Sequence, residues 1–162
     1  MDQVLTKERE TMAKEKSAMT KEKSKTSYII ENFLNKNKFI FYKRVQDDIV
    51  VFMLPYRVGS RKIVIDINLF TFENSNLCRM NFKCKLNEKH DSSKELLDMN
   101  ANLVNGNLSV MSNTNYVSFN TNFVLDRNSK INDLYYDSLY NCFSILYELQ
   151  DKDIVEVNID EE

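Results

Sequence analysis

The residues of this chain that could do chemistry are few and scattered. His90 is the single histidine, and it lies in a charged loop beside Asp91. One imidazole cannot supply a nucleophile, a base and an orienting group by itself. The only glycines are Gly59 and Gly106, so a glycine-rich phosphate loop cannot be built, and no Walker A, GxSxG, HExxH or GxGxxG motif occurs. We expect no catalytic residue and no cofactor.

The three cysteines do not form a metal site or a disulfide framework. Cys78, Cys84 and Cys142 lack CxxC spacing, and they are typical of reduced thiols in a cytosolic protein. Cys142 lies on the apolar side of a predicted helix, so we expect it in the core. Cys78 and Cys84 are on one predicted strand, on the same side and roughly 20 Å apart, too far to pair. Adjacent acids such as Asp47-Asp48 fall in predicted turns, where carboxylates are solvated. We therefore expect no metal and no enzyme.

A nucleic-acid surface is the alternative that the basic residues suggest. The run Phe39–Arg44 is similar in composition to the platforms that stack single strands, but alternation divides its aromatic residues between two faces of a strand. The net charge of −2 and pI near 5.6 also disfavour bulk attraction to phosphate. The alternative function is a small inhibitor or regulator of a nucleic-acid-handling complex. Its candidate contacts are Lys43, Arg44, Arg57, Arg61 and Lys62.

The first 26 residues form a charged leader. Three seven-residue units follow one another from Leu5, each with one apolar position, which is occupied by Leu5, Met12 and Met19. A coiled coil needs apolar residues at both a and d of each heptad, so we expect a helical or disordered leader in residues 1–26. Met12 and Met19 are candidate partner-binding residues if the leader acts as an interaction helix. No apolar run is long enough to span a membrane, and we expect a cytoplasmic protein.

The patterns after the leader predict one α+β domain over residues 27–150. We expect an antiparallel sheet, made of a four-stranded meander and a hairpin, with helices packed on one face. The order is helix, four strands, helix, two strands, helix. The expected strands are Phe39–Val45, Ile49–Tyr56, Lys62–Phe72, Leu77–Leu86, Leu108–Met111 and Tyr116–Leu125. Thr26 or Ser27 is expected to cap the first helix, and Ser92 with Glu95 the second.

The last predicted helix carries two tyrosines of interest and is followed by an acidic segment. The helix begins near Ser129 and places Tyr136 and Tyr140 four residues apart, turned away from its apolar side. Tyrosine is favoured at protein interfaces, so these two are candidate partner contacts, although phenols at the water boundary of a packed helix are the simpler interpretation. Residues 151–162 are expected to form an exposed acidic tail, or a short strand through Ile154, Val155 and Val157.

The segment Leu96–Leu108 resembles the YbjN and type III secretion chaperone-like family. It has a paired leucine followed by Asn100 on a helix, then Gly106 and a hairpin that leads to a long final helix. The resemblance implies a bacterial, chaperone-like protein that binds extended protein segments, is often a homodimer and has no catalysis. It also implies that Leu96, Leu97 and Asn100 are packing and turn-supporting positions. We expect a protein-binding module that uses its sheet face and last helix.

Overall fold

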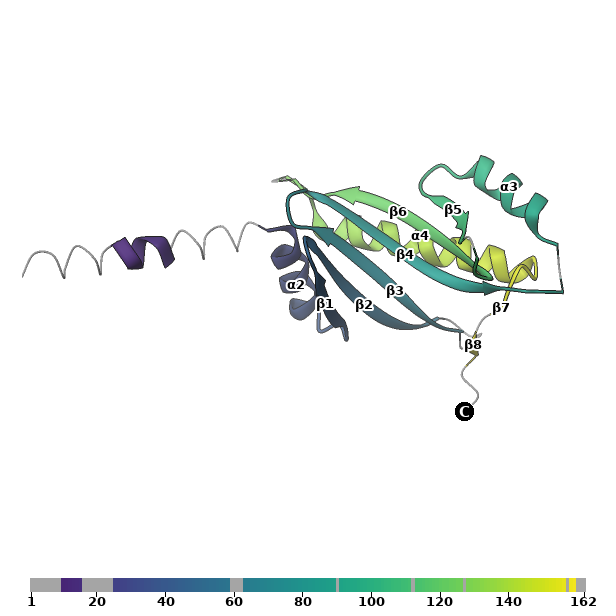
Figure 1. Ribbon diagram of the computed structural model, residues 1–162, viewed down its shortest axis with the longest axis horizontal. Helices are drawn as coiled ribbons and strands as arrows, with labels where there is room; N and C mark the ends of the chain where they lie inside the picture. Colours follow the sequence, from purple (N-terminus) through teal and green to yellow (C-terminus); the bar gives the residue numbers. More distant parts are fainter. Residues whose placement is uncertain are drawn as a thin grey trace, which may run out of the picture.

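The computed structural model describes residues 10–15, 25–58, 63–89, 91–111, 113–126, 128–156 and 158–159. Residues 10–15 are helical. The remaining elements are α2 (Thr26–Lys36), β1 (Tyr42–Gln46), β2 (Ile49–Val58), β3 (Ile63–Phe72), β4 (Leu77–Leu86), α3 (Ser93–Asn102), β5 (Asn107–Val110), β6 (Tyr116–Val124), α4 (Ile131–Asp151), β7 (Val155–Glu156) and β8 (Asn158–Ile159). The predicted α+β class and element order are confirmed (Figure 1).

All eight strands belong to one antiparallel sheet. The order along its main path is β1-β2-β3-β4-β6-β5, while β7 pairs with β4 and β8 with β3. The meander is closed by short turns, and Asp47 takes a left-handed backbone (φ 51°) between β1 and β2, a conformation that aspartate tolerates. Pro55 lies in β2 beyond the end of the β1 ladder, which stops at Met53, so its missing N–H removes no bond to β1.

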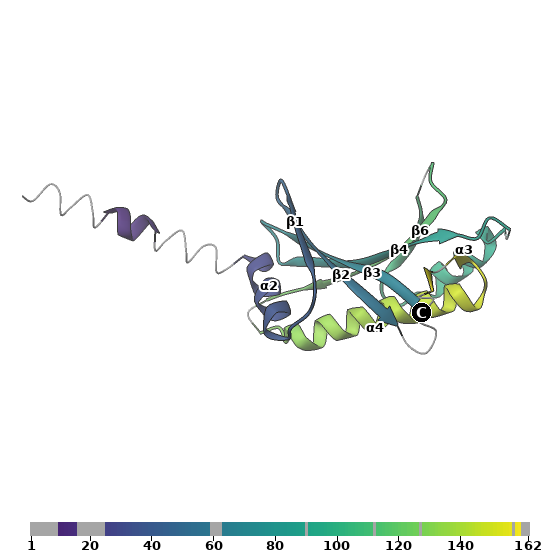
Figure 2. The same ribbon diagram turned by 90° about the horizontal axis from the view of Figure 1, so that it is seen from below.

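One face of the sheet is buried, and none of the described helices covers the other. In β3 the burial alternates strictly, with Ile63, Ile65, Ile67 and Leu69 inside. The ladder partners Leu54 and Phe52 of β2 and Met80 of β4 are buried on the same side. α4 packs on this buried face against β4 and β6, and the sheet curves away from it (Figure 2). The two layers form a single core.

An aromatic cluster joins α4 to α2 and the sheet. The ring of Tyr135 is fully buried, with centroids 5.0 Å from Phe33 and 5.4 Å from Phe39. Its hydroxyl lies 2.6 Å from that of Tyr56 on β2. Burial raises the pKa of both phenols, so the pair stays protonated and each hydroxyl satisfies the other. Cys142 is also buried, as predicted.

Both predicted helix caps are wrong in detail. α2 begins one residue early, at Thr26, whose hydroxyl donates to the carbonyl of Ser75 at 2.8 Å instead of capping the helix. Ser92 occupies the N-cap position of α3 without a side-chain cap bond, and the N–H of Ser93 donates to Asp91 Oδ1 at 3.2 Å. Thr26 thus gives its hydroxyl to a carbonyl outside α2, and Asp91 rather than Ser92 accepts an N–H in the first turn of α3.

α3 is anchored by fewer residues than the sequence suggests. Leu96 and Met99 are buried, and Asn100 Oδ1 accepts the N–H of Leu108 at 2.9 Å, which makes Asn100 a turn-supporting residue as expected. Leu97, in contrast, is 70 % exposed, so its expected packing role is wrong. The reason is that α3 contacts the sheet mainly at the four-residue strand β5, where there is room for only one narrow apolar stripe.

The acidic end of the chain is only partly exposed. Ile154 and Val155 are buried, and β7 and β8 each add two residues to the sheet. The short-strand alternative therefore describes this segment better than a wholly exposed tail. Val157 and residues 160–162 lie outside the described residues.

Candidate functional site

The side of the sheet opposite α4 is the candidate binding surface, and we call it the open face. Alternation on paired strands places residues from five strands, β1, β2, β3, β4 and β6, on it, with cross-strand rows fixed by the ladder register. Its principal residues are Tyr42, Arg44, Ile49, Val51, Met53, Arg57, Val64, Asp66, Asn68, Phe70, Arg79, Asn81, Lys83, Lys85, Tyr116, Asn120, Asn122 and Val124. Because the sheet curves away from α4, this face is concave (Figure 2).

Apolar side chains line a hollow of about 550 Å³ over β1 to β3. Val51, Met53 and Phe70 contribute to its surface, and Tyr42 and Arg44 stand at the β1 side. Tyr42 is 67 % exposed and Met53 is 40 % exposed, which is unusual for side chains of this size. An apolar concavity left open by the described helices is typical of a surface that contacts another molecule.

A line of basic residues follows β4 through the middle of the open face. Arg79, Lys83 and Lys85 all point to this side, and Arg44 and Arg57 add two further positive charges on β1 and β2. Among the described residues of these strands, the acidic side chains on the open face are Asp66 on β3 and Glu156 on β7. Residues 1–26 hold seven Lys/Arg and five Asp/Glu, so 27–162 keeps 15 basic and 19 acidic residues. The open face is therefore positive on a domain that is negative.

Asparagine side chains form a row across three central strands of the open face. Asn68 Nδ2 donates to Asn81 Oδ1 at 3.3 Å, and Asn81 Nδ2 donates to Asn120 Oδ1 at 3.2 Å. Beside this row, Arg79 Nε donates to Asn122 Oδ1 at 3.1 Å. The amides satisfy one another in the interior of the face, so they fix its shape rather than leaving polar groups unpaired.

The sheet divides where β3 and β4 separate. Their ladder covers only Asn68–Thr71 with Cys78–Asn81, and beyond it β3 pairs with β8 while β4 pairs with β7. This fork lies between Ile65–Ile67 of β3 and Phe82–Cys84 of β4. Figure 1 shows β3 and β4 diverging towards β8 and β7. The fork holds a cleft of about 370 Å³ whose lining includes Val64, Asp66, Tyr116 and the two lysines of β4.

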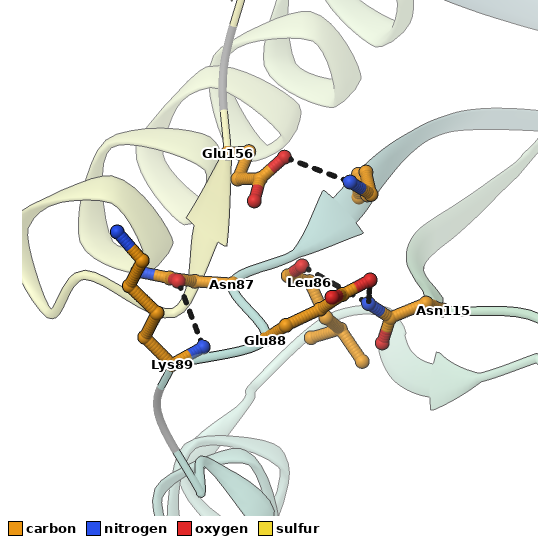
Figure 3. Close-up of polar contacts among 7 residues, drawn as sticks. Leu86, Asn87, Glu88, Lys89, Asn115 and Glu156 are labelled. Atoms are coloured by element: carbon orange, nitrogen blue, oxygen red, sulfur yellow. Dashed lines mark hydrogen bonds and ion pairs between the residues drawn. The ribbon is translucent and has the colours of Figure 1, made fainter.

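Polar contacts join the C-terminal segment and the β5–β6 turn to the end of β4 beside the fork. Glu156 Oε2 lies 3.2 Å from Lys85 Nζ, and this bond, aided by the charge of Glu88, raises the pKa of Lys85 (Figure 3). Asn115 Nδ2 donates to Glu88 Oε1 at 3.0 Å, which ties the β5–β6 turn to the end of β4. Asn87 N–H donates to the carbonyl of Ile154 at 2.8 Å. The C-terminal segment is thus fastened to β4 beside the cleft.

The predicted partner residues of α4 lie on the other side of the molecule. Tyr136 is 44 % exposed and Tyr140 is 73 % exposed, both on the side of α4 turned from the sheet. α4 carries four acidic residues and no basic one, so this side is negative. The acidic residues are Asp133, Asp137, Glu148 and Asp151. The structure does not bring the tyrosines together with the open face.

The remaining predicted contacts are dispersed. Met12 is 60 % exposed in the helix of residues 10–15, and Met19 lies outside the described residues. Of the basic set, Arg44 and Arg57 are on the open face, but Lys43 faces the other way and donates to Glu31 Oε2 at 2.6 Å. Arg61 and Lys62, like His90, fall outside the described residues. The predicted basic set does not form one stripe.

Sequence reasoning missed the basic residues of β4. Arg79, Lys83 and Lys85 occur at odd positions of a correctly predicted strand, while Cys78, Met80 and Phe82 at even positions are buried. Alternation alone therefore gave the signal, but it was applied to apolar residues only. These residues form a basic face only together with β1 to β3, and the pattern of each strand alone does not predict how β1 to β3 align with β4.

Nothing in the described part of the chain assembles reactive groups. No group of three or more His, Cys, Asp or Glu side chains lies close enough there to hold a metal ion. Burial raises the pKa of the thiols of Cys78, Cys84 and Cys142 to about 12, and all three are free. A protonated, buried thiol is a poor nucleophile. None of the described helices is long and apolar enough to cross a membrane.

Comparison with known proteins shows the fold alone. No protein-family model matches the chain, and no curated protein sequence matches it. Among solved structures the chain is similar to YbjN from E. coli, a protein proposed to be a transcription regulator, with a TM-score of 0.58 and 10% sequence identity. The match covers 79% of this chain and 93% of YbjN. The expected YbjN-like fold is therefore confirmed as a likeness of structure.

Proposed function

We propose that this chain is a non-catalytic module that binds another protein on its open face. The single observation that carries the proposal is the concave side of the sheet that none of the described helices covers, where apolar and basic side chains lie together. One-sided sheets expose polar residues to water as a rule, whereas here Tyr42, Met53 and Val64 are each more than a third exposed. The YbjN-like fold supports a binding role, and we expect the chaperone-like homodimer that the resemblance implies.

The test compares variants of the two exposed sides. The tagged full chain is used to capture partners from lysate of the source cells, with Met53→Glu on the open face and Tyr140→Glu on α4 as matched variants. Both replaced side chains are exposed, so each variant is expected to fold. We expect the partner to be retained by wild type and Tyr140→Glu and lost by Met53→Glu. Loss only with Tyr140→Glu would move the site to α4, and no retained protein would refute the module.

A regulator of a nucleic-acid-handling complex is the second candidate. Its support is the positive open face, where Arg44 stands beside Tyr42 and Phe70 in one hollow. Aromatic and basic residues together can stack and neutralise a single strand. Binding of an oligonucleotide that weakens steeply with salt, and that Met53→Glu abolishes, would favour this candidate over a protein partner.

A further inference from the structure

The fork leaves strand edges inside the sheet. On the side of the cleft, none of the described residues pairs with β3 at Ile65–Ile67 or with β4 at Phe82–Cys84. Each strand is paired there only on its other side, β3 with β2 and β4 with β6. A strand edge offers backbone N–H and C=O groups in register, which an extended peptide can use.

The C-terminal segment shows what such a peptide looks like. Residues 154–159 read Ile-Val-Glu-Val-Asn-Ile, an alternation of apolar and polar positions typical of a strand. β7 pairs with Lys85 and Leu86, and its carboxylate at Glu156 meets the ammonium of Lys85 on the open face. β8 pairs with only two residues of β3, Ile63 and Val64. The chain thus places a strand segment of its own, with one carboxylate at Glu156, at one end of the fork.

From this arrangement we propose that the open face takes an extended acidic segment of a partner protein, by strand addition at the fork. One carboxylate of that segment pairs with Lys83 at the fork, and a second carboxylate further along the segment pairs with Arg44 beside the hollow. Its aliphatic side chains lie on Met53 and Val64. The inference rests on the proposed function and specifies the class of partner.

Charge and spacing match this occupant. Lys83 and Lys85 are two residues apart on β4, so their side chains are about 7 Å apart, the spacing of alternate residues in a facing strand. Lys85 is paired with Glu156, whereas Lys83 and Arg44 have no ion pair among the described residues. Asp66 is the acidic residue of β3 that faces the same cleft. Lys83 and Arg44 therefore remain available to pair with two carboxylates of the segment.

The fork cleft continues into the apolar hollow. Met53, Asn68 and Lys83 line both, so a segment that enters at the fork can cross β3 towards β1. Val51 and Phe70 then supply apolar contact beneath it. The carboxylates of Asp66 and Glu156 in the cleft would repel phosphates. This favours an acidic peptide, which can place apolar residues beside them, over a single-stranded nucleic acid.

The test measures peptide binding to the full chain by fluorescence anisotropy. The probe is a labelled peptide with the sequence of residues 152–162, and the control peptide has lysine at each Asp and Glu. The protein variants are Lys83→Glu on the open face and Lys94→Glu on α3, which make the same charge change at two exposed lysines. Lys83→Gln removes the charge without reversing it. Thermal unfolding checks that every variant is folded.

We expect the acidic peptide to bind wild type and Lys94→Glu equally, and about five- to tenfold more weakly to Lys83→Glu, with Lys83→Gln between them. Asn158→Pro removes a backbone donor from β8, which pairs with Ile63 and Val64 next to the free edge of β3. This variant should bind the peptide more strongly, because a peptide that extends along β3 past Ile65 then meets less competition from β8. Equal binding by Lys83→Glu, or by the lysine peptide, would overturn the inference. So would an oligonucleotide that binds more tightly than the peptide and depends on Lys83.

The outcomes separate this inference from the proposed function. If a partner is captured through Met53 but the acidic peptide does not bind, the module stands and the acidic segment is wrong. If neither partner capture nor peptide binding is observed, both the proposed function and the acidic segment are wrong.

Discussion

Ile154→Ala tests whether the C-terminal segment is part of the folded core. Ile154 is 0 % exposed, its N–H donates to the carbonyl of Leu149 at 2.9 Å, and its carbonyl accepts from Asn87 at 2.8 Å. The substitution leaves both backbone bonds in place and removes three buried carbons. The loss therefore comes from burial and from the cavity that remains, and we expect the free energy of unfolding to fall by about 2–4 kcal/mol.

Urea unfolding followed by circular dichroism measures this change. For a chain of this length, a loss of about 3 kcal/mol corresponds to a melting temperature lower by about 6–12 °C. The matched control is Ile40→Ala, the same change at an isoleucine that is 74 % exposed, and it should stay within about 0.5 kcal/mol of wild type. A loss below about 1 kcal/mol for Ile154→Ala, or equal losses at both positions, would refute the role of this segment in the core.

Three further predictions address the interior. Tyr135→Phe should lower the free energy of unfolding, measured in urea, by about 1–2 kcal/mol, because the hydroxyl of Tyr56 loses its partner at 2.6 Å. No change would mean that the phenols do not stabilise each other. Gly106→Ala should cost about 2–4 kcal/mol, because φ is +92° and a Cβ would lie 2.5 Å from the carbonyl oxygen of Asn120; wild-type stability would contradict that geometry. With thiol pKa values of about 12, the native cysteines should resist a disulfide reagent at pH 8 and react on unfolding; labelling as fast as free thiol would contradict their burial.

The strands and helices could be predicted because their patterns are local. β4 runs from Leu77 to Leu86 as the alternation indicated, and the alternation of β3 identified its buried face. Asn100 supports the turn before β5, which the resemblance implied. These features depend on residues close together in the sequence, where periodicity and turn chemistry are sufficient.

The fork and the charge of the open face could not be predicted, because they depend on how distant strands align. The sequence indicates that Lys83 faces one side of β4, but only the register of the sheet places it beside Met53 and Asn68. Leu97 illustrates the same limit from the other direction. Its helical spacing is that of a core residue, yet α3 covers so little of the sheet that the side chain meets water.

The two exposed sides of the molecule constrain how it can bind. The open face is basic, the outer side of α4 is acidic, and the sheet and core lie between them. A compact partner can contact only one of these sides. An acidic segment is attracted to the open face and repelled by the outer side of α4. A homodimer formed through Tyr136 and Tyr140 would leave both open faces turned outward, so pairing of two copies and capture of two segments are compatible. A dimer that instead joined open faces would block the fork. Like charges oppose self-association through either side, because the open face is basic and α4 carries four acidic residues and no basic one.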